Sequence, residues 1–139
     1  MTLISLEFNY TRTDCQKGKI EIYCIVDSKL LSETNSITLK RFDEDAALEE
    51  LAIVSKGVVH VFNNTNRSGV DVDGLISYVS LSYLTISIMG AVFDPLKDKG
   101  PYMCSCVGFG KKGGLIIENS TPEMLNITGN SIYRIYFSR

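Results

Sequence analysis

The sequence of 139 residues contains no tryptophan, one histidine and three prolines, and it has no excess of basic residues. Its formal net charge of −2 gives no global positive field that would draw the chain to nucleic acid or to an anionic membrane, although a local patch is compatible with it. Residues 75–93 form the longest apolar stretch, but five Ser and Thr residues interrupt it, so it does not resemble a spanning helix. The first residues lack the basic start and apolar run of a signal peptide.

The sequence is rich enough in apolar residues to build a core. Hydrophobic residues make up 45% of the chain and charged residues 22%, which is ordinary for a folded soluble protein. The length indicates one globular domain, residues 1–139. Alternating apolar and polar residues, β-branched segments and turn signals predict strands near 2–11, 20–26, 36–42, 57–63, 75–93 (one strand or two), 102–110, 115–119 and 131–137.

One segment has the pattern of an amphipathic helix. Asp43 can cap a first turn, apolar residues follow at three- and four-residue spacing, and Gly57 can end the helix in a left-handed conformation. We therefore predict a helix at about 43–56 and a shorter helical turn at about 121–128, where Pro122 suits the first turn. The expected fold class is α+β, dominated by antiparallel sheet with about seven to nine strands.

The segment "GPYMCSCVGFGKKGGLIIEN" combines two cysteines, four closely spaced glycines and two lysines. Cys104 and Cys106 would share one face of a strand, and the spacing of Cys15 and Cys24 does not fit a zinc knuckle, so we interpret the cysteines as buried free thiols. The glycines and lysines lack the order of a phosphate-binding loop and are typical of a hairpin turn. Lys111 and Lys112 would lie exposed at its tip.

No other motif predicts chemistry. A calcium-loop interpretation of residues 64–75 fails because Leu75 stands where a bidentate Glu is required, so Asp71 and Asp73 are interpreted as turn residues. His60 lies in an apolar strand without an identifiable nucleophile, which favours a core or edge histidine. We therefore predict a non-enzymatic protein with no cofactor, no metal and no small-molecule substrate.

Five N-x-S/T sequons begin at asparagines throughout the chain. Such sequons matter only in a secreted protein, and without a visible secretion signal we interpret them as part of a chain rich in Asn, Ser and Thr. They begin at Asn9, Asn63, Asn66, Asn119 and Asn126.

Two segments, "TLISLEFNY" (2–10) and "YLTISIMGAVFDPLKDKGPYM" (83–103), carry a resemblance to a known family. They resemble the compact matrix proteins of bornaviruses, which belong to a wider group of matrix proteins from negative-strand RNA viruses. The resemblance covers about a fifth of the chain. It implies a homo-oligomeric virion protein on the cytoplasmic side of a membrane, linking anionic lipid to nucleocapsid proteins or RNA.

The matrix-like function would place membrane or nucleic-acid binding at Lys97 and Lys99, together with Lys111 and Lys112 if the two loops meet. Lysines near an anionic surface contribute about 1 kcal/mol each, which an oligomer could multiply by avidity. The alternative is an intracellular interaction or inhibitor domain of the immunity or adaptor type. Its partner would bind the acidic face of the predicted helix, formed by Asp43, Asp45, Glu49 and Glu50.

Overall fold

The computed structural model describes residues 3–12, 18–63 and 65–125, and these residues are mainly β-strand. The helical segments in this part are short: η1 (Ser28–Leu30), η2 (Gly90–Val92) and α1 (Pro95–Asp98). The strands are β1 (Ile4–Arg12), β2 (Gly18–Asp27), β3 (Leu31–Phe42), β4 (Leu48–Ser55), β5 (Val58–Val61), β6 (Val70–Leu75), β7 (Leu81–Met89), β8 (Gly100–Gly110), β9 (Leu115–Asn119) and β10 (Glu123–Leu125).

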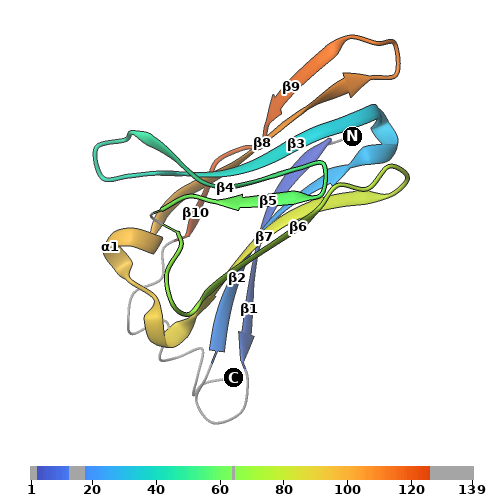
Figure 1. The fold of residues 1–139 in the computed structure, drawn as a ribbon. Coiled ribbons are helices and arrows are strands. Elements are labelled where there is room, and N and C mark those ends of the chain that lie inside the picture. The colour runs from blue at the N-terminus through green and yellow to red at the C-terminus, as the bar shows by residue number, and fades with distance from the viewer. Residues whose placement is uncertain (1–2, 13–17, 64, 126–139) are drawn as a thin grey trace.

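The strands form two antiparallel sheets that face each other (Figure 1). The first sheet has the order β1-β2-β7-β6. The second has the order β10-β8-β3-β4-β5, with β9 also paired to β8 along residues 105–109. β10 pairs with the beginning of β8, so β9 and β10 pair one after the other with different parts of β8.

The core lies between the sheets and follows from strict alternation along the strands. In β2, every second residue from Gly18 to Val26 is buried, while the residues between them are partly exposed. This period of two directs one side of each strand to the core and the other outward. The chain has no tryptophan, and Ile37 and Leu39 of β3, both fully buried, fill the middle of the second sheet's inner face.

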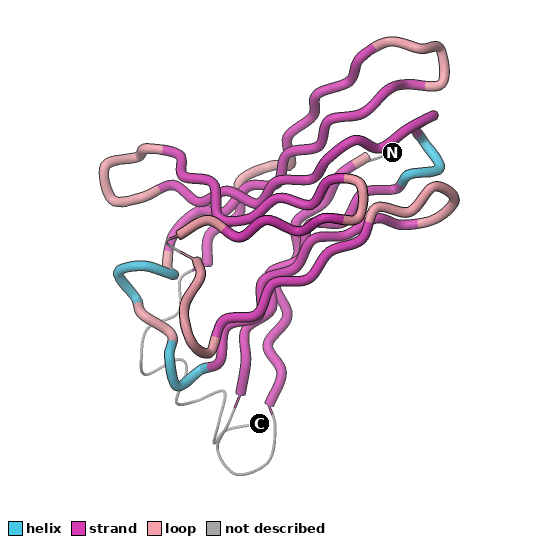
Figure 2. Tube along the Cα trace, viewed as in Figure 1, coloured by secondary structure: helices cyan, strands magenta, loops and turns pink. Residues whose placement is uncertain are grey.

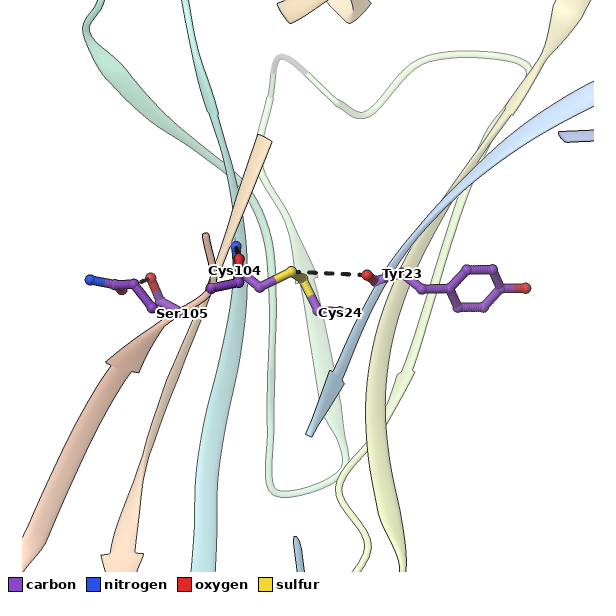
Figure 3. The surroundings of a disulfide bond; sticks show 6 residues. Tyr23, Cys24, Cys104 and Ser105 are labelled. Carbon is purple, nitrogen blue, oxygen red and sulfur yellow. Dashed lines mark hydrogen bonds between the residues drawn. A yellow bond between two sulfur atoms is a disulfide. The ribbon is translucent and has the colours of Figure 1, made fainter. Parts of the chain in front are cut away.

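A disulfide joins the two sheets through this core. Cys24 of β2 and Cys104 of β8 are bonded, with their Cα atoms 5.7 Å apart (Figure 3). The Tyr23 ring points away from the bond in Figure 3, as alternation along β2 requires. The expectation that these cysteines are free thiols is therefore wrong for Cys24 and Cys104. Cys106 is a buried free thiol as predicted, and Cys15 lies outside the described residues.

A hydrogen bond and an ion pair hold the beginning of β8, at the end of the strand opposite its turn to β9. The buried Tyr102 hydroxyl donates a hydrogen bond to the carbonyl oxygen of Asp98, four residues upstream (2.5 Å). The Asp98 carboxylate in turn forms an ion pair with Arg67, at the approach to β6. Burial, and then the charge of Asp98, raises the pKa of Tyr102 well above its ordinary value.

The strand order, the disulfide between the sheets and the hydrogen bond of Tyr102 together match one known architecture. Variable-type immunoglobulin sandwiches have sheets ordered A-B-E-D and G-F-C-C′-C″, a disulfide from B to F, and a corner tyrosine two residues before the second cysteine. With β1 to β9 taken as A to G in chain order, each of these features is present. The chain has the architecture of a variable-type immunoglobulin sandwich.

The predicted α+β class is wrong, because the amphipathic helix at 43–56 does not form; the β-rich, antiparallel character is confirmed. The segment is instead a turn followed by β4. Asp43 accepts from the amides of Asp45 and Ala47 (2.9 Å each), so the cap-like signal serves a hairpin turn. Lys56 and Gly57, both with positive φ, form the hairpin turn to β5 where the helix was expected to end.

A bulge explains why β4 carries a helix-like apolar pattern. Leu39 lies opposite Ala52, but the next residue, Lys40, lies opposite Glu50, so Leu51 is the extra residue. The bulge lets Leu51 and Ala52 be buried in succession, which breaks the alternation that marks a strand. Long-range pairing with β3 then outweighs the local helical preference.

Three smaller predictions also differ from the structure. Residues 123–125 of the predicted helical turn at 121–128 form β10. Asp71 and Asp73 lie in β6 instead of a turn, and Asp73 accepts a hydrogen bond from the Tyr83 hydroxyl (3.1 Å). The strand predicted at 131–137 and the last part of the helical turn lie outside the described residues.

Candidate binding site at one end of the sandwich

Four turns come together at one end of the molecule. Because successive strands from β2 to β9 run in alternating directions, the turns after β2, β4, β6 and β8 lie at the same end (Figure 2). We call this surface the turn end; it consists of residues 28–30, 56–57, 76–80 and 111–114. The turns after β3, β5 and β7 lie at the opposite end.

Buried hydroxyl groups hold two of these turns together. Thr34 donates to Ser28 (2.9 Å), Ser28 lies 2.6 Å from Ser82, and Ser82 donates to the carbonyl oxygen of Ser77 (3.3 Å). The Ser28 amide also donates to the carbonyl oxygen of Ser80 (3.2 Å), which ties η1 to the β6–β7 turn. A satisfied buried network of this kind fixes the relative position of the elements that it joins.

The β6–β7 turn presents its apolar side chains to solvent. The Ser77 hydroxyl accepts from the amides of Val79 and Ser80 (3.3 and 3.1 Å), so the turn is closed by its own side chain. Tyr78 is 76% and Val79 79% exposed at its tip. Other large exposed apolar side chains flank the four turns; they are Leu75, Leu81, Val58 and Leu115. A concentration of exposed apolar side chains on a rigid turn is typical of an interaction site.

The same turns carry only positive charge. Lys29, Lys56, Lys111 and Lys112 lie in them, all exposed, and none of the turn residues is Asp or Glu. The opposite end has a different balance, because the β3–β4 turn contains three acidic residues, 43–45. An acidic protein therefore has one basic, partly apolar end.

The four lysines predicted to bind membrane or nucleic acid do not meet. Lys111 and Lys112 follow β8, whereas Lys97 and Lys99 precede it, at the opposite end. The eleven residues of β8 span about 35 Å at the rise of an antiparallel strand. The binding role of these lysines stays a prediction, but the structure divides them into two separate pairs.

The four acidic residues predicted to meet a partner also have different surroundings. Glu49 pairs with Arg41 (3.0 Å) toward the interior, whereas Glu50 lies opposite Lys40 on the outer face of the sheet. Asp43 is engaged in the β3–β4 turn, and Asp45 is exposed there. Without the helix they do not form one acidic face.

A cavity of about 370 Å³ lies between the sheets at the end opposite the turn end. Four of its five charged groups form two ion pairs, Arg41 with Glu49 and Arg67 with Asp98, and Arg41 also donates to the carbonyl oxygen of Lys99 (2.8 Å). The fifth, Lys97, is exposed. No histidine or cysteine is among its described lining residues, which include the hydroxyl groups of Thr65 and Tyr102.

The remaining candidates for chemistry are dispersed. His60 is exposed on the edge strand β5 and packs edge-to-face on Phe62 (4.7 Å between centroids), in keeping with an edge histidine. Burial, and then the charge of Glu118, raises the pKa of the Cys106 thiol to about 11, which makes it a poor nucleophile at neutral pH. Within residues 3–12, 18–63 and 65–125, no cluster of His, Cys, Asp or Glu could hold a metal ion.

Sequence reasoning missed the serines and exposed apolar residues of the β6–β7 turn. The signal was present in "SYVSLS" (77–82), where Ser77 and Ser80 stand three residues apart with Tyr78 and Val79 between them. Serines at this spacing are typical of a turn closed by a side-chain hydroxyl. It also missed the pairing of Cys24 with Cys104, although Tyr102 stands two residues before Cys104.

No protein-family model matches this chain, and none of the curated proteins matches its sequence. No helix of the described part is long and apolar enough to cross a membrane. Because one sandwich architecture carries many unrelated functions, a function must be argued from the surface of this molecule.

Proposed function

We propose that this chain is a non-enzymatic recognition domain that binds an acidic protein surface through its turn end. The observation that carries the proposal is the β6–β7 turn, where exposed Tyr78 and Val79 stand on a backbone fixed by buried hydroxyls. A turn whose backbone is held in place before binding loses little conformational entropy on association, and tyrosine adds a large contact area.

Charge gives the partner its chemistry. Lys29 and Lys56 accompany the apolar tip, and Lys111 and Lys112 add two further positive charges on the β8–β9 turn. A partner with carboxylates around an apolar spot would match both features. Such complementarity sets specificity and association rate more than affinity.

The disulfide supports the setting of such a domain. Bonds such as Cys24–Cys104 form and persist in oxidising compartments and are rare in the cytosol. We therefore propose an extracytoplasmic location, in place of the cytoplasmic side of a membrane that the matrix resemblance implies.

The test is selection of peptides from a random displayed library on the immobilised protein, followed by affinity measurement with four forms of the protein. We expect acidic, aromatic-containing peptides whose binding weakens at least tenfold in Tyr78→Ser and in the double variant Lys111→Glu/Lys112→Glu. The matched control is Lys97→Glu/Lys99→Glu at the opposite end, which should bind as the parent does. Peptides that bind all four forms equally would refute the turn end as the site.

A matrix-like function is the second candidate, since lysines beside an exposed tyrosine and valine also suit an anionic membrane surface. That candidate requires self-association as well, because the four lysines of the turn end offer only weak attraction to one copy. Nucleocapsid proteins or RNA would be its further partners.

A further inference from the structure

Asparagines of this chain occur in sequons more often than its composition predicts. Five of its eight asparagines are followed two residues later by Ser or Thr, although these two types make up only 23 of the 139 residues. The four within the described residues, Asn9, Asn63, Asn66 and Asn119, are all exposed. Exposure is what a carbohydrate attached to the side chain requires.

The four asparagines differ in what their side chains already bind. Asn9 donates to Glu21 (3.4 Å), and Asn119 accepts from Ser105 (2.6 Å). The side chains of Asn63 and Asn66, in the connection from β5 to β6, make no hydrogen bond within the described part. A sugar on either of these two would break no hydrogen bond of the described residues.

The sequon beginning at Asn63 contains a buried hydroxyl without a hydrogen bond in the part of the chain that the structure describes. Thr65 is only 4% exposed, and it lines the cavity between the sheets. Burying an unpaired hydroxyl costs stability, and valine would fill the same volume without that cost. The sequon supplies a requirement on this hydroxyl that the contacts of the described residues do not.

We propose that Asn63 is an N-glycosylation site, and that Thr65 keeps its hydroxyl because the unfolded chain must present it to the glycosylating enzyme. In the transfer, the Asn63 amide nitrogen bonds to the anomeric carbon of a lipid-linked oligosaccharide pyrophosphate. The bond from that carbon to the pyrophosphate oxygen breaks, and the amide proton leaves with the lipid pyrophosphate. The transfer needs no oxidant or reductant.

The position of Asn63 fits a binding domain. The connection from β5 to β6 lies at the end opposite the turn end, so a glycan there leaves Tyr78 and Val79 free (Figure 1). This inference rests on the extracytoplasmic location in the proposed function, but not on the binding activity. A glycan without peptide binding, or binding without a glycan, would separate the two.

The experiment expresses the full chain behind a cleavable secretion signal in eukaryotic cells and maps glycans in total cell protein and medium by mass spectrometry after enzymatic deglycosylation. We expect most chains to carry a glycan on Asn63, and we expect Asn63→Gln and Thr65→Val each to abolish it. Thr65→Val should also melt at a higher temperature than unglycosylated parent protein made in bacteria, when both are compared without glycan.

Thr85 provides the matched control. Its hydroxyl is likewise buried without a hydrogen-bond partner among the described residues, but it belongs to no sequon. Thr85→Val should therefore raise the melting temperature and leave the Asn63 glycan in place. An unmodified Asn63 in the folded parent protein, or an Asn63 glycan that persists in Thr65→Val, would overturn the inference.

Discussion

Tyr102 connects three parts of the molecule through one side chain. Its ring packs edge-to-face on Phe8 of β1 (6.0 Å between centroids), across the interface of the two sheets. Its hydroxyl donates to the carbonyl oxygen of Asp98, and the Asp98 carboxylate pairs with Arg67. Removing the hydroxyl leaves a buried carbonyl oxygen without this donor, which costs about 1–3 kcal/mol.

We therefore expect Tyr102→Phe to lower the free energy of unfolding by about 1–3 kcal/mol at neutral pH. The loss should shrink as the pH rises above about 10, the ordinary pKa of tyrosine. The folded parent keeps Tyr102 protonated because its pKa is raised, whereas the unfolded chain releases the proton, so the parent loses stability there. Urea titrations between pH 7 and pH 11 measure both effects.

Tyr78→Phe is the control for this comparison, because Tyr78 is exposed and its hydroxyl makes no hydrogen bond with residues 3–12, 18–63 or 65–125. It should unfold as the parent does at every pH. A difference between parent and Tyr102→Phe that stays constant through the alkaline range would contradict the raised pKa.

At the scale of elements, the disulfide fixes β2 to β8 and thereby one sheet to the other. It closes a loop with a sequence separation of 80 residues, which greatly restricts the unfolded chain. We expect Cys24→Ala/Cys104→Ala to lose about 2–5 kcal/mol of stability in urea unfolding, in the range found for small domains. Cys106→Ala, which changes a buried thiol outside the bond, should lose clearly less; equal losses would contradict the role of the bond.

Much of the strand layout could be predicted, because strands of a half-buried sheet show their period in the sequence. The alternation along β2 and the turn at residues 111–114 were sufficient to place β2, β8 and β9. The helix prediction failed where local and long-range information conflict. Asp43 and Gly57 are signals that helix ends and hairpin turns share, and the bulge at Leu51 imitates helical spacing.

The binding site was less predictable than the strands, because it is assembled from turns distant in sequence. Lys111 and Lys112 were recognised as exposed, but their position at the same end as Tyr78 follows only from the strand order. The pairing of Ser28 with Ser82 joins residues 54 apart, and no local pattern reports such a contact. Only the serines within the β6–β7 turn gave a local signal.

At the scale of the whole molecule, the charge balance differs between the two ends. The four turns of the turn end carry four lysines and no acidic residue, whereas at the other end Lys97 and Lys99 accompany the three acidic residues of the β3–β4 turn. At about 1 kcal/mol for each lysine near an anionic bilayer, the turn end of one copy would gain about 4 kcal/mol. That corresponds to a dissociation constant of about 1 mM, too weak to hold a monomer on vesicles at physiological salt.

The oligomeric state and membrane binding should therefore distinguish the two candidate functions when they are measured together. As a recognition domain, the protein should elute as a monomer by light scattering on a size-exclusion column. It should also stay off vesicles of phosphatidylcholine and phosphatidylserine in a flotation assay at low and at physiological salt. An oligomer that floats with these vesicles, is released by salt, and loses flotation in Lys111→Glu/Lys112→Glu but not in Lys97→Glu/Lys99→Glu would contradict this expectation. Avidity would then carry the weak attraction of each copy, and the matrix-like function would replace protein recognition.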